Sequence, residues 1–332
     1  MPMTTPLADR YVERRWTSPD GLNLYARDYA PAEGPARLPV IAIHGLTRNS
    51  ADFGVIAGLI AHSGRRVLAV DVRGRGRSDR APDPMTYTPD VYAKDVVALM
   101  EQAGIEKAVF LGTSMGGLIT LALTALKPKA IAAAILNDVG PEVAAEGLAR
   151  IAAYTGQPVA VESWDDATAY ARRINEAAFP DYTDADWAAF ARRVFREGTE
   201  GAPVLDYDPD IAAPIKAAGS KALVPNLWPS FRALARKKPT LLVRGGTSDL
   251  LSSAIADKMK KAAPAIGGRP GSSAASVSLP TLRRAGWNSK RSVPRSKIQS
   301  AENRLSLSAK IKAAAETLDH RLKFDLQVDI TN

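Results

Sequence analysis

Short apolar runs alternate with amphipathic segments over most of the chain. The runs have the length of β-strands: Arg10–Thr17, Leu22–Asp28, Pro39–His44, Arg66–Val70, Lys107–Leu111, Ala130–Leu136 and Thr240–Val243. Helical spacing of apolar residues separates several of them: Ser50–Ser63, Thr88–Ala103 and Gly116–Leu126. Uninterrupted apolar strands are typical of a parallel sheet that is buried on both faces. The pattern therefore predicts an α/β protein with a doubly wound, mostly parallel sheet.

The alternation stops between residues 141 and 235, where the pattern is mainly helical. Ser163 with Asp166 has the spacing of a helix-start box. Because this stretch lies between two predicted strands, we expect a helical cap at 141–235, inserted into a core formed by 1–140 and 236–266.

Thr183 with Asp186 has the same helix-start spacing within the cap. Three tryptophans, Trp164, Trp187 and Trp228, also lie in this stretch. Packing of a small helical subdomain is the favoured interpretation of these rings. The alternative is that one or two of them face a ligand pocket beneath the cap.

The positive charge is concentrated at one end of the chain. Of the net +9, residues 267–332 contribute 12 Lys and Arg against 5 Asp and Glu, whereas the rest holds 32 basic and 30 acidic residues. The segment from 267 to 300 contains no acidic residue and 8 serines. This composition predicts an irregular basic tail over 267–332. The near-neutral body favours no nucleic-acid partner.

The apolar runs are also too short for a membrane span, and residues 1–16 lack the apolar stretch of a secretory signal. We therefore expect a cytoplasmic protein with no membrane partner. The pattern gives no indication of an oligomeric state.

The content of cysteine and histidine limits the kinds of catalytic and metal sites that the chain can form. The chain has no Cys, which excludes disulfides, thiolate nucleophiles and Cys-ligated metal sites, and its histidines are His44, His62 and His320. The glycine-rich segment 71–78 does not match a dinucleotide-binding loop, because Asp79 stands where the last glycine is required. We expect no metal and no cofactor.

A candidate nucleophile lies in the segment Gly112-Thr113-Ser114-Met115-Gly116-Gly117, which follows a strand and opens a helix. Such a sharp, strained turn requires small residues on both sides of the serine, here Gly112 and Gly116. It presents Ser114 at the carboxyl edge of the sheet, next to a helix N-terminus that favours developing negative charge. The alternative interpretation is that Ser114 is a simple helix N-cap.

A second loop, His44-Gly45-Leu46, ends a neighbouring strand. The backbone N–H of Leu46 and that of Met115 are candidates for an oxyanion hole. His44 precedes the Gly45 turn, so we interpret it as a residue that positions the loop and not as a general base.

Two aspartates are candidates for the acid that would orient a catalytic imidazole. Asp249 follows the last predicted strand, within Arg244-Gly245-Gly246-Thr247-Ser248-Asp249. Asp138, after the strand that ends at Leu136, is the alternative acid. A turn residue is the simpler interpretation of either aspartate when it is taken alone.

These motifs together resemble the α/β-hydrolase family over about residues 20–266. The segments that carry the resemblance are His44-Gly45, Asp71-x-Arg73-Gly74-x-Gly76-x-Ser78, Gly112-x-Ser114-x-Gly116-Gly117, Asn137-Asp138-x-Gly140-Pro141 and Gly246-x-x-Asp249. The resemblance implies Ser114 as nucleophile, Leu46 and Met115 as oxyanion donors, Asp249 as acid and a cap over the pocket. A serine nucleophile separates the chain from the haloalkane dehalogenases and epoxide hydrolases. It leaves the small-molecule carboxylesterases, the lactonases and the carbon–carbon bond hydrolases, with small esters, lactones or related acyl compounds as the expected substrates.

The catalytic base of the family is missing from its expected place. Family members follow the acid with a strand and a Gly-His loop, whereas this chain has no histidine between His62 and His320. His320 lies in a helix-like segment with no strand or glycine loop before it, so a solvated helix histidine is favoured over a substitute base. The sequence thus predicts a serine hydrolase impaired by the loss of its base. The alternative is a non-catalytic scaffold that binds a small ligand or a partner in the capped pocket.

An abrupt change to Arg, Ser and Gly usage near Ile266 motivates a further hypothesis, a reading-frame slip at that point. Read one nucleotide later, permitted codons for residues 283–295 can spell an acidic turn and the start of an apolar helix. The nucleotide sequence of codons 260–300 tests this hypothesis. We expect a neighbouring frame that encodes a Gly-His loop and a terminal helix, and the absence of such a frame would contradict the slip.

Overall fold

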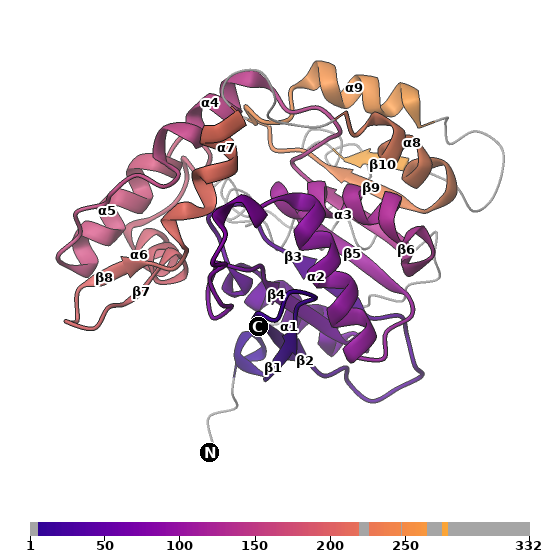
Figure 1. Ribbon diagram of the computed structural model, residues 1–332, viewed down its shortest axis with the longest axis horizontal. Helices are drawn as coiled ribbons and strands as arrows, with labels where there is room; N and C mark the ends of the chain where they lie inside the picture. Colours follow the sequence, from indigo (N-terminus) through magenta and orange to yellow (C-terminus); the bar gives the residue numbers. More distant parts are fainter. Residues whose placement is uncertain (1–5, 219–225, 247, 264–273, 278–332) are drawn as a thin grey trace, which may run out of the picture.

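The computed structural model describes residues 6–218, 226–246, 248–263 and 274–277, and centres on one large sheet (Figure 1). Its strand order is β1-β2-β4-β3-β5-β6-β9-β10, with β1 and β2 antiparallel to their neighbours and the other pairs parallel. This arrangement confirms the predicted doubly wound, mostly parallel sheet. The strands are β1 Val12–Thr17, β2 Asn23–Tyr29, β3 Val40–Ile43, β4 Val67–Asp71, β5 Ala108–Thr113, β6 Ile131–Asn137, β9 Thr240–Val243 and β10 Ala274–Val277.

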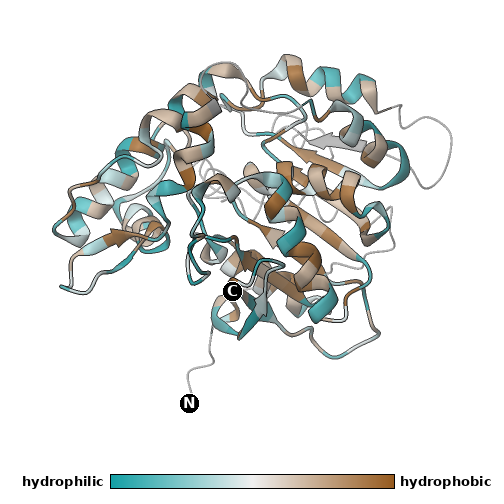
Figure 2. Ribbon diagram, in the orientation of Figure 1, coloured by the Kyte–Doolittle hydropathy of each residue, from teal (hydrophilic) through white to brown (hydrophobic). Residues whose placement is uncertain are grey.

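Helices cover both faces of the sheet, as the uninterrupted apolar strands require. In β3, Ile41 and Ile43 face one core cluster, whereas Val40 and Ala42 face the other. The first cluster includes side chains of α2, α3, α8 and α9, and the second includes those of α1. Figure 2 shows the strands as the most hydrophobic part of the molecule. These helices are α1 Gly54–His62, α2 Pro89–Gln102, α3 Met115–Leu126, α8 Trp228–Lys237 and α9 Ser253–Ala262.

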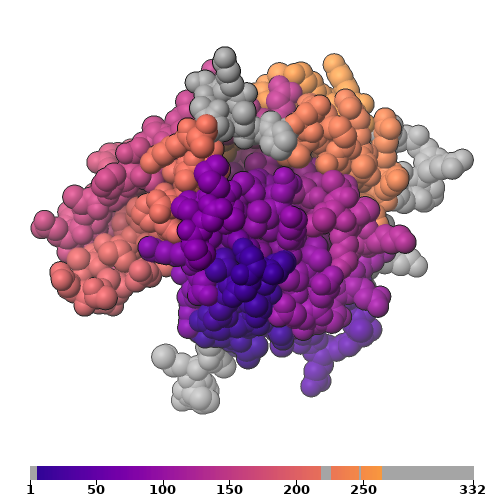
Figure 3. Space-filling model, viewed as in Figure 1, coloured from indigo at the N-terminus to yellow at the C-terminus, as the bar shows by residue number. Residues whose placement is uncertain are grey.

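A second lobe, which we call the cap, extends from α4 to α7 and lies at one side of the core (Figure 3). It has its own apolar cluster, which includes Trp187 and Phe190. Both predicted capping boxes, at Ser163 and Thr183, are present. The cap elements are α4 Ala145–Tyr154, α5 Trp164–Asn175, α6 Asp184–Val194, β7 Phe195–Glu197, β8 Pro203–Leu205 and α7 Ala213–Ala218. Short 3-10 helices complete the described elements: η1 Leu7–Asp9, η2 Ser50–Phe53, η3 Pro84–Thr86, η4 Pro128–Ala130 and η5 Pro209–Ala212.

The cap differs from its prediction in two respects. The antiparallel hairpin β7–β8 interrupts a stretch that was predicted to be mainly helical. The helix α8 lies within the predicted cap range, but it packs on α3, and its Phe231 and Leu234 join the core around the sheet. Helical periodicity identifies α8 as a helix, but it does not say which apolar surface the helix will cover.

The strand β10 is a further difference, because we expected an irregular segment beyond residue 266. Its four residues pair in parallel with β9 and extend the sheet by one strand. The rest of the predicted basic tail, including His320, lies outside the described residues. Within the described ranges, no helix combines the length and the apolar character needed to cross a bilayer.

The segment after β8 fastens the cap to the core through Asp206. The Asn49 side-chain amide donates to Asp206 Oδ2 at 2.7 Å, and the Gly76 N–H donates to the Asp206 carbonyl oxygen at 2.9 Å. Burial of the carboxyl raises its pKa to about 6, and the charge of nearby Asp71 adds to the shift, against the opposing charge of Arg196. The folded protein therefore holds the Asp206 proton more tightly than the unfolded chain does.

This shift makes stability depend on pH in a defined window. The ordinary pKa of an aspartate is 3.8. Between this pH and about pH 6 the folded protein still binds the proton that the unfolded chain has released, so the free energy of unfolding falls as pH rises. In the native chain we expect Asp206 to lower the free energy of unfolding by about 2 kcal/mol across this window, and we expect this fall to be absent from Asp206→Asn. Urea unfolding at a series of pH values measures it, with the exposed Asp181→Asn as the control. Equal pH dependence in Asp206→Asn and the native chain would contradict the assignment.

Candidate active site

The turn from β5 into α3 holds Ser114 in a conformation that few side chains adopt. Its φ is 49° and its ψ is −115°. A Cβ at Gly112 would lie 2.4 Å from the Gly116 carbonyl oxygen, and one at Gly116 would lie 2.0 Å from that of Ile43. Both contacts are too short for any side chain, so the sequence folds into this sharp turn only with glycine at these two positions.

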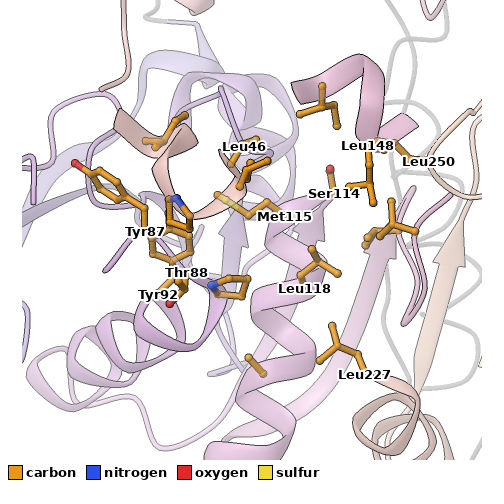
Figure 4. Close-up of a pocket in the computed structure, with 18 of the residues that line it drawn as sticks. Leu46, Tyr87, Thr88, Tyr92, Ser114, Met115, Leu118, Leu148, Leu227 and Leu250 are labelled. Carbon is orange, nitrogen blue, oxygen red and sulfur yellow. The ribbon is translucent and has the colours of Figure 1, made fainter. Parts of the chain in front are cut away.

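Ser114 lies at the wall of a cavity of about 370 Å³, and Figure 4 shows it between Leu46 and Met115 on one side and Leu148 and Leu250 on the other. Its own N–H donates to the Asn137 carbonyl oxygen at 2.9 Å, which fixes the turn to the end of β6. Met115 is the first residue of α3, so its N–H has no acceptor within the helix. This N–H therefore remains a candidate oxyanion donor.

The loop after β3 comes close to the serine. A Cβ built on Gly45 would lie 3.7 Å from the Ser114 Cβ, and Leu46 lines the same cavity. The structure thus brings together Ser114, Leu46 and Met115, three of the residues singled out from the sequence. Their proximity is the arrangement that a nucleophile and two oxyanion donors need.

His44 is occupied at both ring nitrogens. Nε2 accepts from the Val72 N–H at 3.1 Å, which leaves Nδ1 to donate to the Gly45 carbonyl oxygen at 2.7 Å. Complete burial lowers the pKa of the imidazole to about 3. A neutral ring with both nitrogens engaged fixes the path of the loop and cannot take a proton from Ser114.

The predicted acid Asp249 is paired with a cation from the cap. Arg150 of α4 donates to both carboxylate oxygens, at 2.9 Å from Nη2 to Oδ1. These hydrogen bonds from Arg150 hold the pKa of Asp249 below its usual range. The helix α4 is close at this point, because a Cβ at Gly147 would lie 2.6 Å from the Asp249 carbonyl oxygen. Asp249 is therefore ionised and serves as an anchor for α4.

The alternative acid, Asp138, connects the ends of two neighbouring strands. It adopts a φ of 59°, and its Oδ1 accepts from the Gly245 N–H at 2.9 Å, so it ties the end of β6 to the end of β9. This contact matches the role of a turn residue.

The histidines of the described ranges are His44 and His62, and His62 is exposed in the last turn of α1. The described residues thus place no histidine beside Ser114, and His320 lies outside them. The same residues contain no group of three or more His, Cys, Asp or Glu side chains that could hold a metal ion.

The cavity is walled mainly by apolar side chains from both the core and the cap, and Asp90 is the charged residue among them. Sequence reasoning missed most of these positions, because nothing in a helical pattern says which cap residues turn toward the sheet. None of the three tryptophans is in the lining. The lining residues are Leu46, Tyr87, Thr88, Pro89, Asp90, Tyr92, Ser114, Met115, Leu118, Ala122, Val139, Val143, Leu148, Ile151, Ala152, Ile211, Pro214, Ile215, Leu227 and Leu250.

Comparisons with known proteins agree with this architecture. The family model described as "alpha/beta hydrolase fold" matches residues 39–269. A 3-hydroxybutyrate-oligomer hydrolase of Cupriavidus necator is 36% identical over 241 residues, which cover 70% of this chain and 80% of that protein.

Among solved structures, an α/β hydrolase from Novosphingobium aromaticivorans is 43% identical with a TM-score of 0.72, over 81% of this chain and 90% of that one. The E-2-(acetamidomethylene)succinate hydrolase is similar in fold, with a TM-score of 0.68 at 20% identity over 94% of this chain and 99% of that one. The parallel sheet, the serine turn and these matches lead to one conclusion: the chain belongs to the α/β hydrolase fold family.

Proposed function

We propose that the protein is a hydrolase of small neutral esters that uses Ser114 as its nucleophile. The observation that carries the proposal is the strained serine turn at the wall of an apolar cavity, with Leu46 and Met115 beside it. The Ser114 oxygen attacks the ester carbonyl carbon, and the two backbone N–H groups bind the resulting oxyanion. Ser114 releases its hydroxyl proton to water as the bond to carbon forms. The C–O bond to the alcohol then breaks, and the leaving alkoxide takes up a proton from water, so that no net proton is consumed. A second water hydrolyses the acyl-enzyme to the acid and returns the proton to Ser114.

The described residues place no histidine beside Ser114, and we propose that this limits the rate of the reaction. Loss of the histidine in a serine hydrolase removes acceleration on the order of a millionfold. Binding and the oxyanion hole alone retain roughly 1,000- to 10,000-fold over the uncatalysed reaction. We therefore propose slow acylation of Ser114 in this chain.

The cavity favours a particular kind of ester. Its lining is mostly aliphatic, and Asp90 disfavours a second negative charge. The 3-hydroxybutyrate-oligomer hydrolase, which covers most of this chain, acts by its name on a chain of ester-linked hydroxyacids. Esters of short aliphatic acids and of hydroxyacids, with no charge near the scissile bond, are the substrates that we propose.

One observation favours a second function, a ligand-binding scaffold without turnover. Asp249, which would orient a histidine in an active relative, has both carboxylate oxygens engaged by Arg150. A protein of this kind would bind apolar ligands in the cavity and leave esters intact.

Labelling with a fluorophosphonate separates the two functions. We expect slow attachment of a single label to the native chain and none to Ser114→Ala, because a serine without a base remains weakly nucleophilic. Intact-mass spectrometry measures the labelled fraction over hours. The matched control is Ser253→Ala, which removes an exposed serine of α9. Labelling that persists in Ser114→Ala would refute the nucleophile, and a native chain that binds ligand but takes no label would support the scaffold.

Matched p-nitrophenyl esters test the substrate class. We expect the neutral hexanoate to acylate the protein at least about tenfold faster than an adipate half-ester, whose free carboxylate must enter the apolar cavity. Asp90→Asn is expected to narrow the difference between the two acylation rates, because it removes the repulsion between two negative charges. Release of p-nitrophenol measures both rates, and equal rates for the two esters would contradict an apolar acyl site.

A further inference from the structure

The arginine at position 75 is buried behind the candidate oxyanion hole, with 1% of its surface exposed. We propose that Arg75 is the positioning residue of this hole, because it contacts both donor residues and places its positive charge behind them. The inference rests on the proposed function, since it concerns the same two donors.

The contacts of Arg75 reach the two donor residues from one side. Its Nε–H donates to the Leu46 carbonyl oxygen at 2.9 Å, and its Nη2 lies 3.5 Å from the Met115 Sδ. The first contact fixes the peptide plane that follows Leu46 and thereby limits the rotation of the Leu46 backbone. The second fixes the side chain of the residue whose N–H is the other donor. One guanidinium thus connects the loop after β3 with the start of α3.

The guanidinium is itself held in place. Nη1 donates to the Arg73 carbonyl oxygen and to the Tyr92 hydroxyl, both at 2.8 Å. The rings of Tyr92 and Tyr87 lie 5.0 Å and 5.5 Å from Cζ, within range of a cation–π interaction. A planar group with donors in fixed directions can satisfy all of these partners at once, whereas a lysine ammonium cannot.

The charge of Arg75 is not neutralised by a carboxylate within the described part of the chain. Arg73, two residues earlier, pairs with both Asp20 and Asp95. No such ion pair forms at Arg75, whose polar partners are carbonyl oxygens, a hydroxyl and a sulfur. Burial is the main reason for the low pKa of His44, and the charge of Arg75 lowers that pKa further. A fixed cation at this place stabilises negative charge as it forms on the substrate oxygen.

The rate at which Ser114 is acylated in Arg75→Met tests the proposal. Removal of one oxyanion donor typically costs about 100- to 1,000-fold. Loss of a group that acts through the donors should slow the reaction less. We therefore expect Ser114 in Arg75→Met to be acylated about 10- to 100-fold more slowly than in the native chain. The ester concentration that gives half the maximal rate should change less than about threefold. Arg75→Lys, which keeps the charge but not the fork, should recover part of the rate. The control is Arg77→Met, because the exposed Arg77 side chain contacts Glu13 and Tyr25 and neither of the two donor residues.

Amide hydrogen exchange tests the positioning role without any reaction. In Arg75→Met we expect the Arg48 amide, which donates to the Gly45 carbonyl oxygen in the same loop, to exchange at least about tenfold faster than in the native chain, with no change in Arg77→Met. Should Arg75→Met fail to fold, Arg75→Lys is to be measured in both experiments. Unchanged exchange together with unchanged acylation in a folded variant would overturn the proposal. If exchange is faster in Arg75→Met but the native chain takes no fluorophosphonate label, Arg75 positions the loop and the proposed hydrolase function is wrong.

Discussion

The close approach of α3 to the ends of β3 and β5 is the constraint on which the candidate site depends. At Gly116 a side chain would collide with the Ile43 carbonyl oxygen, and at Gly112 with the backbone of α3 itself. Because no other residue fits, the helix can begin directly at the sheet edge, and Ser114 takes the strained position between strand and helix. The same approach brings the loop after β3 within reach of the serine. The positions of the candidate nucleophile and of its candidate donors therefore follow from one steric condition.

Polar contacts fasten the cap to this edge. Among them, Arg150 pairs with Asp249, and Asn49 holds Asp206. Apolar contacts add to them, because Ile211 of the cap joins the core around the sheet. The lining of the cavity, among the described residues, is mostly apolar. The candidate site therefore lies in a mainly apolar space between two parts that polar and apolar contacts hold together.

The sequence predicted the elements of this molecule better than their long-range partners. The strand that ends at Val243 and the turn at Ser114 follow from local patterns, namely an apolar run and a spacing of glycines. The packing of α8 on α3, the pairing of Asp249 with Arg150 and the strand β10 were not foreseen. Each of these joins residues far apart in the chain, and neither periodicity nor composition records which distant surface a segment meets.

By itself, the sequence determined the layered sheet, the strained serine turn and the lack of any histidine between His62 and His320, because each is a property of local pattern or of composition. The tertiary structure alone decided that the Arg75 side chain is buried in contact with Leu46 and Met115. It also decided that the aspartate after the last predicted strand is engaged by the cap. The physical reason is that a charged side chain takes its role from the partners and the dielectric surroundings that folding brings to it.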